Sequence, residues 1–550
     1  MASTAVMEIL PVETKCFHAM PPAPRHAIST HLPGWDLMVE FAKRDPAFWA
    51  QFHDMYPRFL IHRDVKQVIE LIIQRTKLED ASCLPFPSRA VAEACVEWVT
   101  PTKRADGLDP VPKDQISIRE FETNGPKLCV VIFPLAHLKL VTPYWVNTGT
   151  GISSRLAEDL LNNIQSLREG SLGELDNRTD DTPISQALRQ RISGLINRAP
   201  VGPPRKTEVS PEDVYLYQTG MSAIVYVHNY LTKWRDNPKS KTVMFGFPFH
   251  QTVHIFEWWG AGLKFFPLGT ELDELEKYLQ DEETNGSPVQ AVWTEFPSNP
   301  LLVSSDLGRL RILADNFHFA LVVDDTVGSF CNVDVLPIAD IIVTSLTKSF
   351  SGYADVMGGS AVLNSEAAKY AEFKTLFDGL YADDLYIRDA EVLLSNSEDY
   401  LTRSTTLNNN AAALVDYLHS LTADPTSCIS KVFYPTINST LSNYEAYKRA
   451  PTSEFIPGYG CLFSIQFDTL EQTIEFYNHF HVHHGPHLGA HRTLAMPYVR
   501  ALYGDELEKV KAWGLEQTQI RISVGLESEK VLVETFKHAL KKADAIKSAK

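Results

Sequence analysis

The stretch that decides the fold runs from Asp340 to Gly359 and reads DIIVTSLTKSFSGYADVMGG. It opens with a β-branched apolar run, which predicts a buried strand. Ser345, Thr347 and Lys348 follow at the end of that run, before a loop that contains glycine. Because ligands in open α/β sheets bind where loops leave the carboxyl ends of the strands, this stretch predicts a ligand site beside Lys348.

The flanking sequence repeats the strand pattern. Residues 241–247 (KTVMFGF), 289–296 (VQAVWTEF) and 320–326 (ALVVDDT) are short apolar runs, and 306–318 (DLGRLRILADNFH) has apolar residues at helical spacing. Strands that alternate with helices predict a mostly parallel sheet covered on both faces. The run ALVVDDT ends at Asp324, so we expect this carboxylate at the same sheet edge as Lys348.

A lysine, a carboxylate and two hydroxyls beside a glycine-containing loop are the groups that pyridoxal 5'-phosphate (PLP) requires. The lysine binds the cofactor covalently, the carboxylate keeps the pyridine nitrogen protonated, and small donors bind the phosphate. Taken singly, an Asp after a strand is more often a turn or a helix cap, and a lone Lys is more often a surface residue. Their joint occurrence favours a cofactor site.

Four segments carry a resemblance to a known family. TSLTKSFSGYADVMGGSAVLN (344–364), EFPSNPLL (295–302), LVVDDT (321–326) and QIRISVGLE (519–527) resemble, in order, motifs of the Cys/Met-metabolism PLP-dependent (trans-sulfuration) enzymes. Four further segments are similar to the fungal-type cystathionine γ-synthases of that family: LPGW (32–35), MYPRF (55–59), TGTGISSRLAE (148–158) and GPHLGAHRTLAMPY (485–498).

The resemblance implies a role for each matching residue. Lys348 would bind PLP and shuttle protons, Asp324 would pair with the pyridine nitrogen, and Arg521 would bind the α-carboxylate of the substrate in a bidentate manner. The phosphate would be bound by Thr219, Gly220, Met221, Ser345 and Thr347. Tyr56 and Arg58 resemble a Y-x-R pair that reaches the phosphate of a neighbouring subunit, which implies a homodimer or homotetramer with shared active sites.

The sequence departs from the family at the aromatic residue that stacks on the cofactor ring. Phe249, in FPFHQT (247–252), takes the place of a tyrosine. Phe249 can stack on the ring, but it has no hydroxyl group. Any acid–base role of that hydroxyl must therefore pass to Lys348 or to a neighbour such as His250.

A second departure lies in GPHLGAHRTL (485–494). Thr493 takes the place of a serine, and Arg492 takes the place of a glutamate near the incoming nucleophile, so we expect both to bind substrate. A positive charge at Arg492 favours an anionic nucleophile over a cationic amine.

Six histidines crowd a short window, at positions 479, 481, 483, 484, 487 and 491. Their spacing matches neither a zinc finger nor an HExxH helix. We therefore predict no metal and place this loop next to the active site.

Composition sets the remaining expectations. The formal net charge of −17 argues against nucleic-acid binding, and no apolar run is long enough to span a membrane. Seven scattered cysteines and a start without the features of a signal peptide favour the cytoplasm. The partners that we expect are a small-molecule amino-acid substrate and a nucleophile.

The predicted fold is PLP fold-type I, α/β, with a mostly parallel seven-stranded sheet. The predicted domains are an N-terminal arm and insertion region (1–210), a PLP-binding large domain (211–400) and a smaller C-terminal α/β domain (401–550).

The predicted reaction is γ-replacement on an O-acyl-L-homoserine, with L-cysteine giving cystathionine. Three alternatives remain open: a carbon nucleophile such as a β-keto acid, or an amine, in specialised metabolism; a β- or γ-lyase; and a catalytically inactive binding protein.

Overall fold

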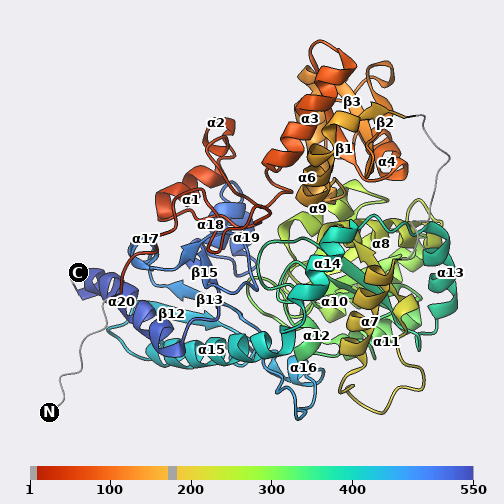
Figure 1. Cartoon of the computed structure of the whole chain (residues 1–550). Helices are drawn as coiled ribbons and strands as arrows, with labels where there is room; N and C mark the ends of the chain where they lie inside the picture. Colours follow the sequence, from red (N-terminus) through yellow and green to blue (C-terminus); the bar gives the residue numbers. More distant parts are fainter. Residues whose placement is uncertain (1–8, 171–181, 549–550) are drawn as a thin grey trace.

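The computed structural model describes residues 9–170 and 182–548. It arranges them as an N-terminal arm, a small N-terminal α/β domain, a large α/β domain and a C-terminal α/β domain (Figure 1). In the described ranges, no helix combines the length and the apolar content that crossing a bilayer requires.

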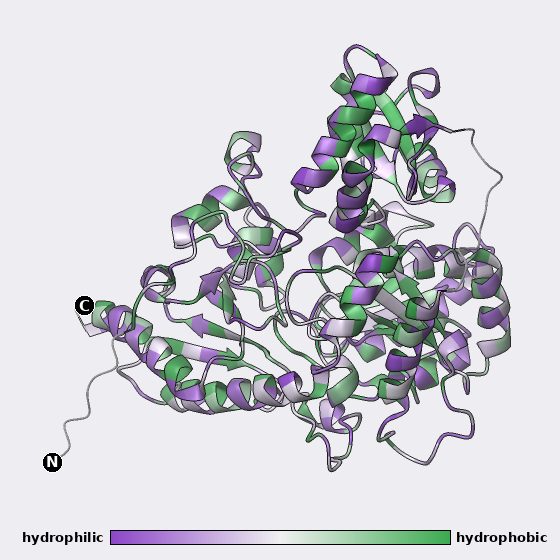
Figure 2. Ribbon diagram, viewed as in Figure 1, coloured by the Kyte–Doolittle hydropathy of each residue, from purple (hydrophilic) through white to green (hydrophobic). Residues whose placement is uncertain are grey.

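The N-terminal domain is built on a four-stranded sheet in the order β1-β3-β2-β4, with four helices packed around it. Helix α3 buries Val65, Val68 and Ile72 on one face, while its other face is hydrophilic (Figure 2). The elements are α3 (Arg63–Thr76), β1 (Ala81–Phe86), α4 (Arg89–Val99), β2 (Ser117–Glu122), β3 (Lys127–Pro134), α5 (Leu138–Thr148), α6 (Ser154–Asn162) and β4 (Arg168–Glu169).

The large domain confirms the predicted mostly parallel seven-stranded sheet. Its order is β5-β11-β10-β9-β8-β6-β7, and β11 alone among these strands runs antiparallel to its neighbours. The strands are β5 (Val214–Tyr217), β6 (Thr242–Phe245), β7 (Leu263–Phe266), β8 (Ala291–Glu295), β9 (Ala320–Asp324), β10 (Ile341–Thr344) and β11 (Gly359–Leu363).

Helices cover both faces of this sheet, as the continuous apolar strands predict, because strands buried on both faces need apolar side chains on both. The helices are α7 (Pro183–Asn197), α8 (Gly220–Arg235), α9 (His250–Trp258), α10 (Leu272–Thr284), α11 (Leu307–Phe317), α12 (Ser329–Asn332), α13 (Tyr370–Leu380) and α14 (Ile387–Asn396). Helix α7 precedes the predicted start of the large domain at residue 211, yet Leu188 and Ile192 pack into the core of that domain.

The C-terminal domain has a five-stranded sheet in the order β12-β13-β16-β15-β14. The strands are β12 (Ile429–Phe433), β13 (Leu462–Phe467), β14 (His483–His484), β15 (Leu494–Met496) and β16 (Gln519–Ser523). The helices are α15 (Tyr400–Leu421), α16 (Leu441–Glu445), α17 (Leu470–His479), α18 (Tyr498–Leu502), α19 (Leu507–Lys511) and α20 (Glu529–Ser548).

The N-terminal arm packs against the C-terminal domain, far from it in sequence (Figure 1). It contains α1 (Trp35–Ala42) and α2 (Pro46–Trp49). Leu32, Trp35 and Met38 are buried in the same hydrophobic core as strands β13 and β16. The arm is therefore an integral part of the C-terminal domain rather than a flexible leader.

Candidate active site

A cavity of about 780 Å³ opens above the carboxyl ends of the large-domain strands. All four parts of the described chain contribute to its wall. The lining residues named by the sequence analysis are Tyr56, Arg58, Gly220, Met221, Phe249, His250, Asp324, Ser345, Lys348, His487 and Arg521. The sheet edge that the sequence predicted as a ligand site is thus the floor of a real pocket.

Lys348 follows strand β10 and faces this pocket. Its Nζ atom lies 4.8 Å from the centre of the Tyr56 ring. Burial lowers the pKa of the Lys348 ammonium, and the positive charges of Arg58 and Arg521 lower it further, while Tyr56 opposes the shift. A lysine with a lowered pKa has a larger neutral fraction, which is the form that acts as a nucleophile or a base.

Asp324 ends strand β9, opposite Glu295 at the end of β8. Its carboxylate accepts a hydrogen bond from the Thr326 backbone N–H at 2.9 Å. Burial raises the Asp324 pKa to about 6, whereas burial and the Asp324 charge raise the Glu295 pKa well above its ordinary value. Asp324 is therefore the more acidic of the pair, which suits it to face a protonated ring nitrogen.

The N-terminus of helix α8 supplies the predicted phosphate turn. Gly220 begins the helix, and a Cβ atom added there would lie 2.6 Å from the Ser345 side chain. Glycine is therefore required for the helix end to approach the loop after β10. Backbone N–H groups at a helix N-terminus attract an anion, and Met221 and Ser345 line the pocket beside them.

Tyr56 and Arg58 border the same end of the pocket, and both are buried. Arg58 donates a hydrogen bond to the Val146 carbonyl at 2.6 Å, and its guanidinium lies 5.7 Å from the Phe249 ring. Burial alone would raise the pKa of the Tyr56 phenol, but Lys348 and Arg58 outweigh burial, so the pKa lies below its ordinary value.

Within this single chain, Tyr56 and Arg58 line the pocket beside Lys348. Their predicted reach into a neighbouring subunit stays a prediction, which one chain does not test. The N-terminal domain follows directly in the sequence and packs its helix α5 against α8 and α9. The Arg58 bond to Val146, near the end of α5, holds the arm over the pocket of the same chain.

Arg521 lies in strand β16 on the opposite side of the pocket. Its guanidinium donates to the Pro486 carbonyl at 2.7 Å and to the Asn299 side-chain oxygen at 3.3 Å, and it lies 4.7 Å from the Tyr498 ring. Neutral groups thus position a buried cation. This arrangement leaves its charge available for a carboxylate ligand.

The hydroxyls of two predicted phosphate ligands are already engaged elsewhere. Thr219 caps helix α8 by accepting from the Ser222 N–H at 3.0 Å, and its own hydroxyl donates to the Gly149 carbonyl. The Thr347 hydroxyl is bonded to the Gly358 backbone. Both predicted phosphate contacts need correction, because these hydroxyls shape the turns that carry Gly220 and Lys348.

Two predicted substrate ligands lie outside the pocket. The Thr493 hydroxyl donates to the Glu527 carboxylate at 2.8 Å and accepts the Gly525 N–H, so it ties two loops together. Arg492 is exposed and does not line the cavity. The expectation that they bind substrate fails because both precede β15, on the far side of the loop that enters the pocket.

The histidine-rich window fastens the arm. His481 and His491 donate to the carbonyls of Ile9 and Pro21, His483 is hydrogen-bonded to Thr14, and the Gly34 N–H donates to His484. His487 differs from these histidines, because it lines the pocket. The predicted position of this loop next to the active site is therefore confirmed.

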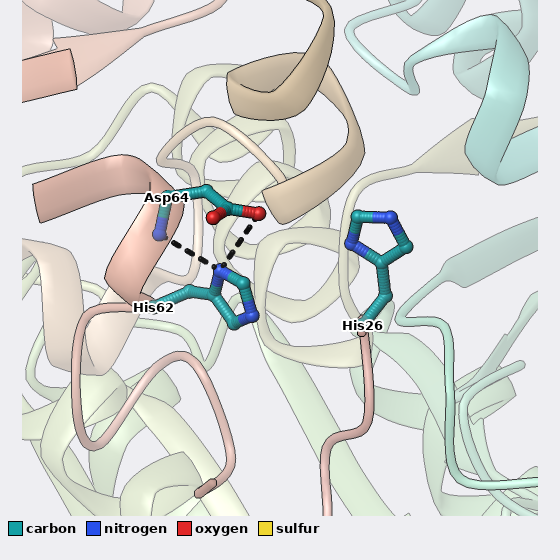
Figure 3. Close-up of side chains that lie close together, drawn as sticks. All are labelled: His26, His62 and Asp64. Carbon is teal, nitrogen blue, oxygen red and sulfur yellow. Dashed lines mark hydrogen bonds and ion pairs between the residues drawn. The ribbon is translucent and has the colours of Figure 1, made fainter. Parts of the chain in front are cut away.

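One group of side chains in the described ranges is compact enough to bind a metal ion: His26, His62 and Asp64 (Figure 3). Its ligand atoms are already satisfied. His26 is bonded to Ser154 and Glu158, His62 donates to the Arg25 carbonyl, and Asp64 pairs with the Arg25 guanidinium at 2.9 Å. Arg25 supplies the positive charge here, so we interpret the group as a joint between the arm and helices α3 and α6.

The sequence analysis left several pocket residues unassigned: Glu295, Asn299, His487 and Tyr498. Each falls inside a segment that was quoted for its resemblance, EFPSNPLL (295–302) or GPHLGAHRTLAMPY (485–498). A polar residue in a matching segment was the signal that could have identified them.

The pocket fits pyridoxal phosphate on the evidence of its buried charges. Arg58 and Arg521 are 4% and 3% exposed, and neither has a carboxylate partner among the described residues. A buried cation without an anion is costly, so each indicates an anionic group of a ligand. Arg58, with the α8 N-terminus and Ser345, would hold the phosphate; Asp324 would face the ring nitrogen, and Lys348 would bind the cofactor.

Comparisons with known proteins agree with this chemistry. Residues 208–541 match the model of the Cys/Met metabolism PLP-dependent enzymes. Residues 64–153 match the model of the N-terminal domain of fungal trans-sulfuration enzymes, which is the domain around β1–β3.

Relatives match along nearly the whole chain. A "cystathionine gamma-synthase-like enzyme iboG1" of Amanita muscaria is 36% identical and covers 95% of this chain and 97% of its own length. A cystathionine gamma-synthase of Neurospora crassa is 30% identical and covers 96% and 98%. Among solved structures, a cystathionine gamma synthase from Xanthomonas oryzae superposes with a TM-score of 0.51 at 20% identity, over 66% of this chain and 87% of that one. This last likeness supports the fold.

Proposed function

The chain belongs to the Cys/Met metabolism PLP-dependent enzyme family, and we propose that it catalyses γ-replacement on an O-acyl-L-homoserine. With L-cysteine as the nucleophile, the product is cystathionine. The proposal rests on one observation above all: Lys348 and Arg521 face the same pocket, at the sheet edge where the cofactor would bind, and the cavity extends beyond them.

Lys348 and Arg521 together orient an α-amino acid. Arg521 is placed to bind the α-carboxylate, because its guanidinium is buried, fixed by neutral groups and free of a carboxylate partner among the described residues. With the carboxylate at Arg521 and the amino group toward Lys348, the Cα hydrogen comes within reach of the lysine amine. Such positioning lowers the barrier by removing the entropy cost of bringing the groups together.

Lys348 is the proton carrier in this proposal. When bound, pyridoxal phosphate supplies an electron sink for the carbons next to the substrate amino group. Lys348, with its pKa lowered by burial, can then take the proton from Cα, give that proton up again, and as a free amine take a second proton from Cβ. Loss of the Cβ proton prepares departure of the acyl group from Cγ, where the nucleophile adds.

The outer part of the cavity would receive the acyl group and the nucleophile. Trp49 of the arm, Leu138 and Pro143 of the N-terminal domain, and Trp258 and Leu502 form an apolar wall there. Such a wall excludes water, which would otherwise compete with the nucleophile.

A second candidate keeps the same acylated homoserine and uses a carbon nucleophile such as a β-keto acid. Two observations favour it. Phe249 borders the pocket without the hydroxyl group of the usual tyrosine, and the outer wall is apolar while Arg44 and Lys139 supply cations beside it. A nucleophile with an apolar chain and a carboxylate suits this part of the cavity, because its chain would contact the apolar wall and its carboxylate would lie near the two cations.

The test is a nucleophile screen of the PLP-loaded protein. O-acetyl-L-homoserine is supplied with L-cysteine or with a β-keto acid, the products are identified by mass spectrometry, and the Lys348→Ala variant serves as the control. Cystathionine formation that depends on Lys348 supports the first candidate. A carbon–carbon product with cysteine left unused replaces it with the second. Ammonia release without any nucleophile would identify a lyase instead.

A further inference from the structure

His487 stands apart from the other histidines of its window because it makes no hydrogen bond. It is 2% exposed, lines the cavity, and neither of its ring nitrogens has a partner among the described residues. Leaving a buried polar group unpaired costs about 1 to 3 kcal/mol, so such groups mark places where a ligand completes the bonding.

The chain on both sides of His487 fixes its position. The Pro486 carbonyl accepts a hydrogen bond from Arg521 at 2.7 Å. Gly489 has a φ of +73°, and a Cβ atom added there would lie 2.6 Å from the Ser349 backbone nitrogen and 3.0 Å from the carbonyl carbon of Lys348. The loop is thus fastened to Arg521 on one side and to the Lys348 backbone on the other, with the imidazole between.

His487 lines the same pocket as Lys348 and Arg521, so it borders the space that an amino acid bound by both would occupy. The α-carboxylate belongs at Arg521 and the amino group at Lys348, and the charges that act on His487 are those of Lys348, Arg521 and His491. The Tyr56 ring also lies nearby, with its centre 6.4 Å from the imidazole. Because His487 lies near both Lys348 and Arg521, it would also lie near the amino group of a substrate that these two residues orient.

We propose that His487 accepts the proton that the substrate ammonium group must lose before its nitrogen can replace Lys348 on the cofactor. The inference rests on the proposed function only in taking an α-amino acid as the substrate. The ammonium N–H bond breaks and the proton passes to a ring nitrogen of His487. The neutral substrate nitrogen could then replace the lysine nitrogen on the bound cofactor, with one of its remaining hydrogens passing to Lys348. Lys348 would be released as a neutral amine, and the proton on His487 would leave to solvent.

The electrostatics of the pocket suit this role. Burial, with Lys348 and Arg521, holds the pKa of His487 well below its ordinary value, so the imidazole is neutral and one of its ring nitrogens can accept a proton. A ligand phosphate at Arg58 and a substrate carboxylate at Arg521 bring negative charge into the pocket. Negative charge raises the basicity of a nearby imidazole, so His487 gains basicity when its substrate arrives.

Two other groups could take the role of the missing tyrosine hydroxyl, and the structure places both less favourably. His250, which the sequence suggested, packs edge-on against His254 and Tyr503, and the charges that act on it are those of His254, Arg44 and Lys509 rather than Lys348 or Arg521. The Tyr56 ring lies at the phosphate end, with its centre 4.8 Å from the Lys348 Nζ atom and 5.3 Å from the Arg58 guanidinium.

The experiment isolates amino-acid binding from the later chemistry. PLP-loaded wild type, H487Q, H250Q and Y56F are mixed with L-2-aminobutyrate, which has no group to expel from Cγ, and the change in cofactor absorbance is followed by stopped flow from pH 6.5 to 9.5. We expect H487Q to bind the cofactor normally and to react about 10²-fold more slowly at pH 7, the usual size of one acid–base contribution. The defect should shrink toward high pH, where the substrate amine loses its proton to solvent, and added imidazole should partly restore the rate at pH 7.

The pH dependence separates a proton acceptor from a structural residue. An H487Q rate equal to wild type overturns the proposal, and so does a defect that stays constant across the pH range. A pH-dependent defect in Y56F or H250Q, with H487Q unaffected, transfers the role to that residue. Because this step precedes the nucleophile, the result stands even if neither cysteine nor a keto acid gives a product in the screen.

Discussion

The two ends of the pocket are built in different ways. The cofactor end is formed by the carboxyl ends of adjacent strands, where β9 and β10 pair in register, with Asp324 opposite Val343, and bring Asp324 and Lys348 to the same pocket. The arm adds Tyr56 and Arg58 to the wall of the pocket, and it is held there by contacts with the C-terminal domain, with Val146 of the N-terminal domain and with Ala354 of the large domain. Local sequence patterns specify the first end. The second depends on which surfaces the arm meets, and this is a property of the whole fold.

The largest expected effect comes from the cofactor end. Lys348→Ala should lower turnover by at least about 10³-fold, because one group supplies both covalent attachment and proton transfer. The variant should still bind PLP through Arg58 and the α8 N-terminus, but borohydride should no longer fix the cofactor to the protein. Lys374→Ala, in helix α13 and outside the pocket, is the control. Retained borohydride labelling in Lys348→Ala would place the attachment elsewhere.

The arm should contribute to cofactor binding through a contact between Arg58 and the phosphate. Arg58→Ala removes a buried cation, and we expect the dissociation constant for PLP to rise about 10- to 100-fold, the value of one charge-assisted bond of about 1.5 to 3 kcal/mol. Arg63→Ala, five residues away and partly exposed, should leave it unchanged. Fluorescence titration of the apo-protein measures both constants, and equal affinities would remove Arg58 from the phosphate site.

Arg521→Lys tests the substrate side of the pocket. A lysine cannot bind a carboxylate in a bidentate manner, so KM for the amino acid should rise about 10-fold or more while PLP affinity stays constant. Arg492→Lys is the matched control, because the structure places this arginine outside the pocket. Steady-state kinetics decide the point. A larger effect at Arg492 than at Arg521 would restore Arg492 as a substrate ligand.

The smallest expected effect is on the stability of the docked arm. Burial lowers the pKa of His31 to about 4 and of His483 and His484 to about 3. These histidines, His31 in the arm and the other two in strand β14 that contacts it, stay neutral in the folded protein but become protonated in the unfolded chain below about pH 6.5. The stability that depends on their neutral form is therefore lost as pH falls from about 6.5 toward 4. At pH 5.5 each should lower the free energy of unfolding by about 1.4 kcal/mol.

Urea unfolding and limited proteolysis of residues 9–60, compared at pH 7.5 and pH 5.5, measure this loss. His484→Asn should reduce the pH dependence, whereas substitution of the partly exposed His137 should not change it. An arm whose protease resistance is the same at both pH values would contradict the histidine contacts as its fastening.

The sequence predicted the sheet and the cofactor end well, because strand patterns and short motifs depend on neighbours in the chain. It identified Lys348, Asp324, Gly220 and Arg521 correctly as pocket residues. It assigned Thr219 and Thr347 to the phosphate because a hydroxyl near a site looks like a ligand. In the structure, these hydroxyls are hydrogen-bonded to backbone groups instead. The prediction that Thr493 and Arg492 bind substrate was wrong for a related reason. The residue types do not reveal where the loop before β15 leaves the pocket.

The arm marks the limit of sequence reasoning. A Y-x-R pair far from the other site residues can serve its own chain or a neighbour, and the motif is the same in both cases. In the single chain, the N-terminal domain contacts α8 and α9, and Tyr56 and Arg58 lie beside Lys348. A homodimer or homotetramer remains our proposal.

The most direct test of this account asks whether one chain completes its own site. The variants Lys348→Ala and Arg58→Ala, each with a different affinity tag, are co-expressed, and any mixed oligomer is isolated through both tags. If the arm serves its own chain, every site in the mixture carries one defect and the activity stays at the level of the single variants. If the arm serves a neighbour, one site of each mixed pair contains both intact residues, and recovery of about half the wild-type activity would contradict the account.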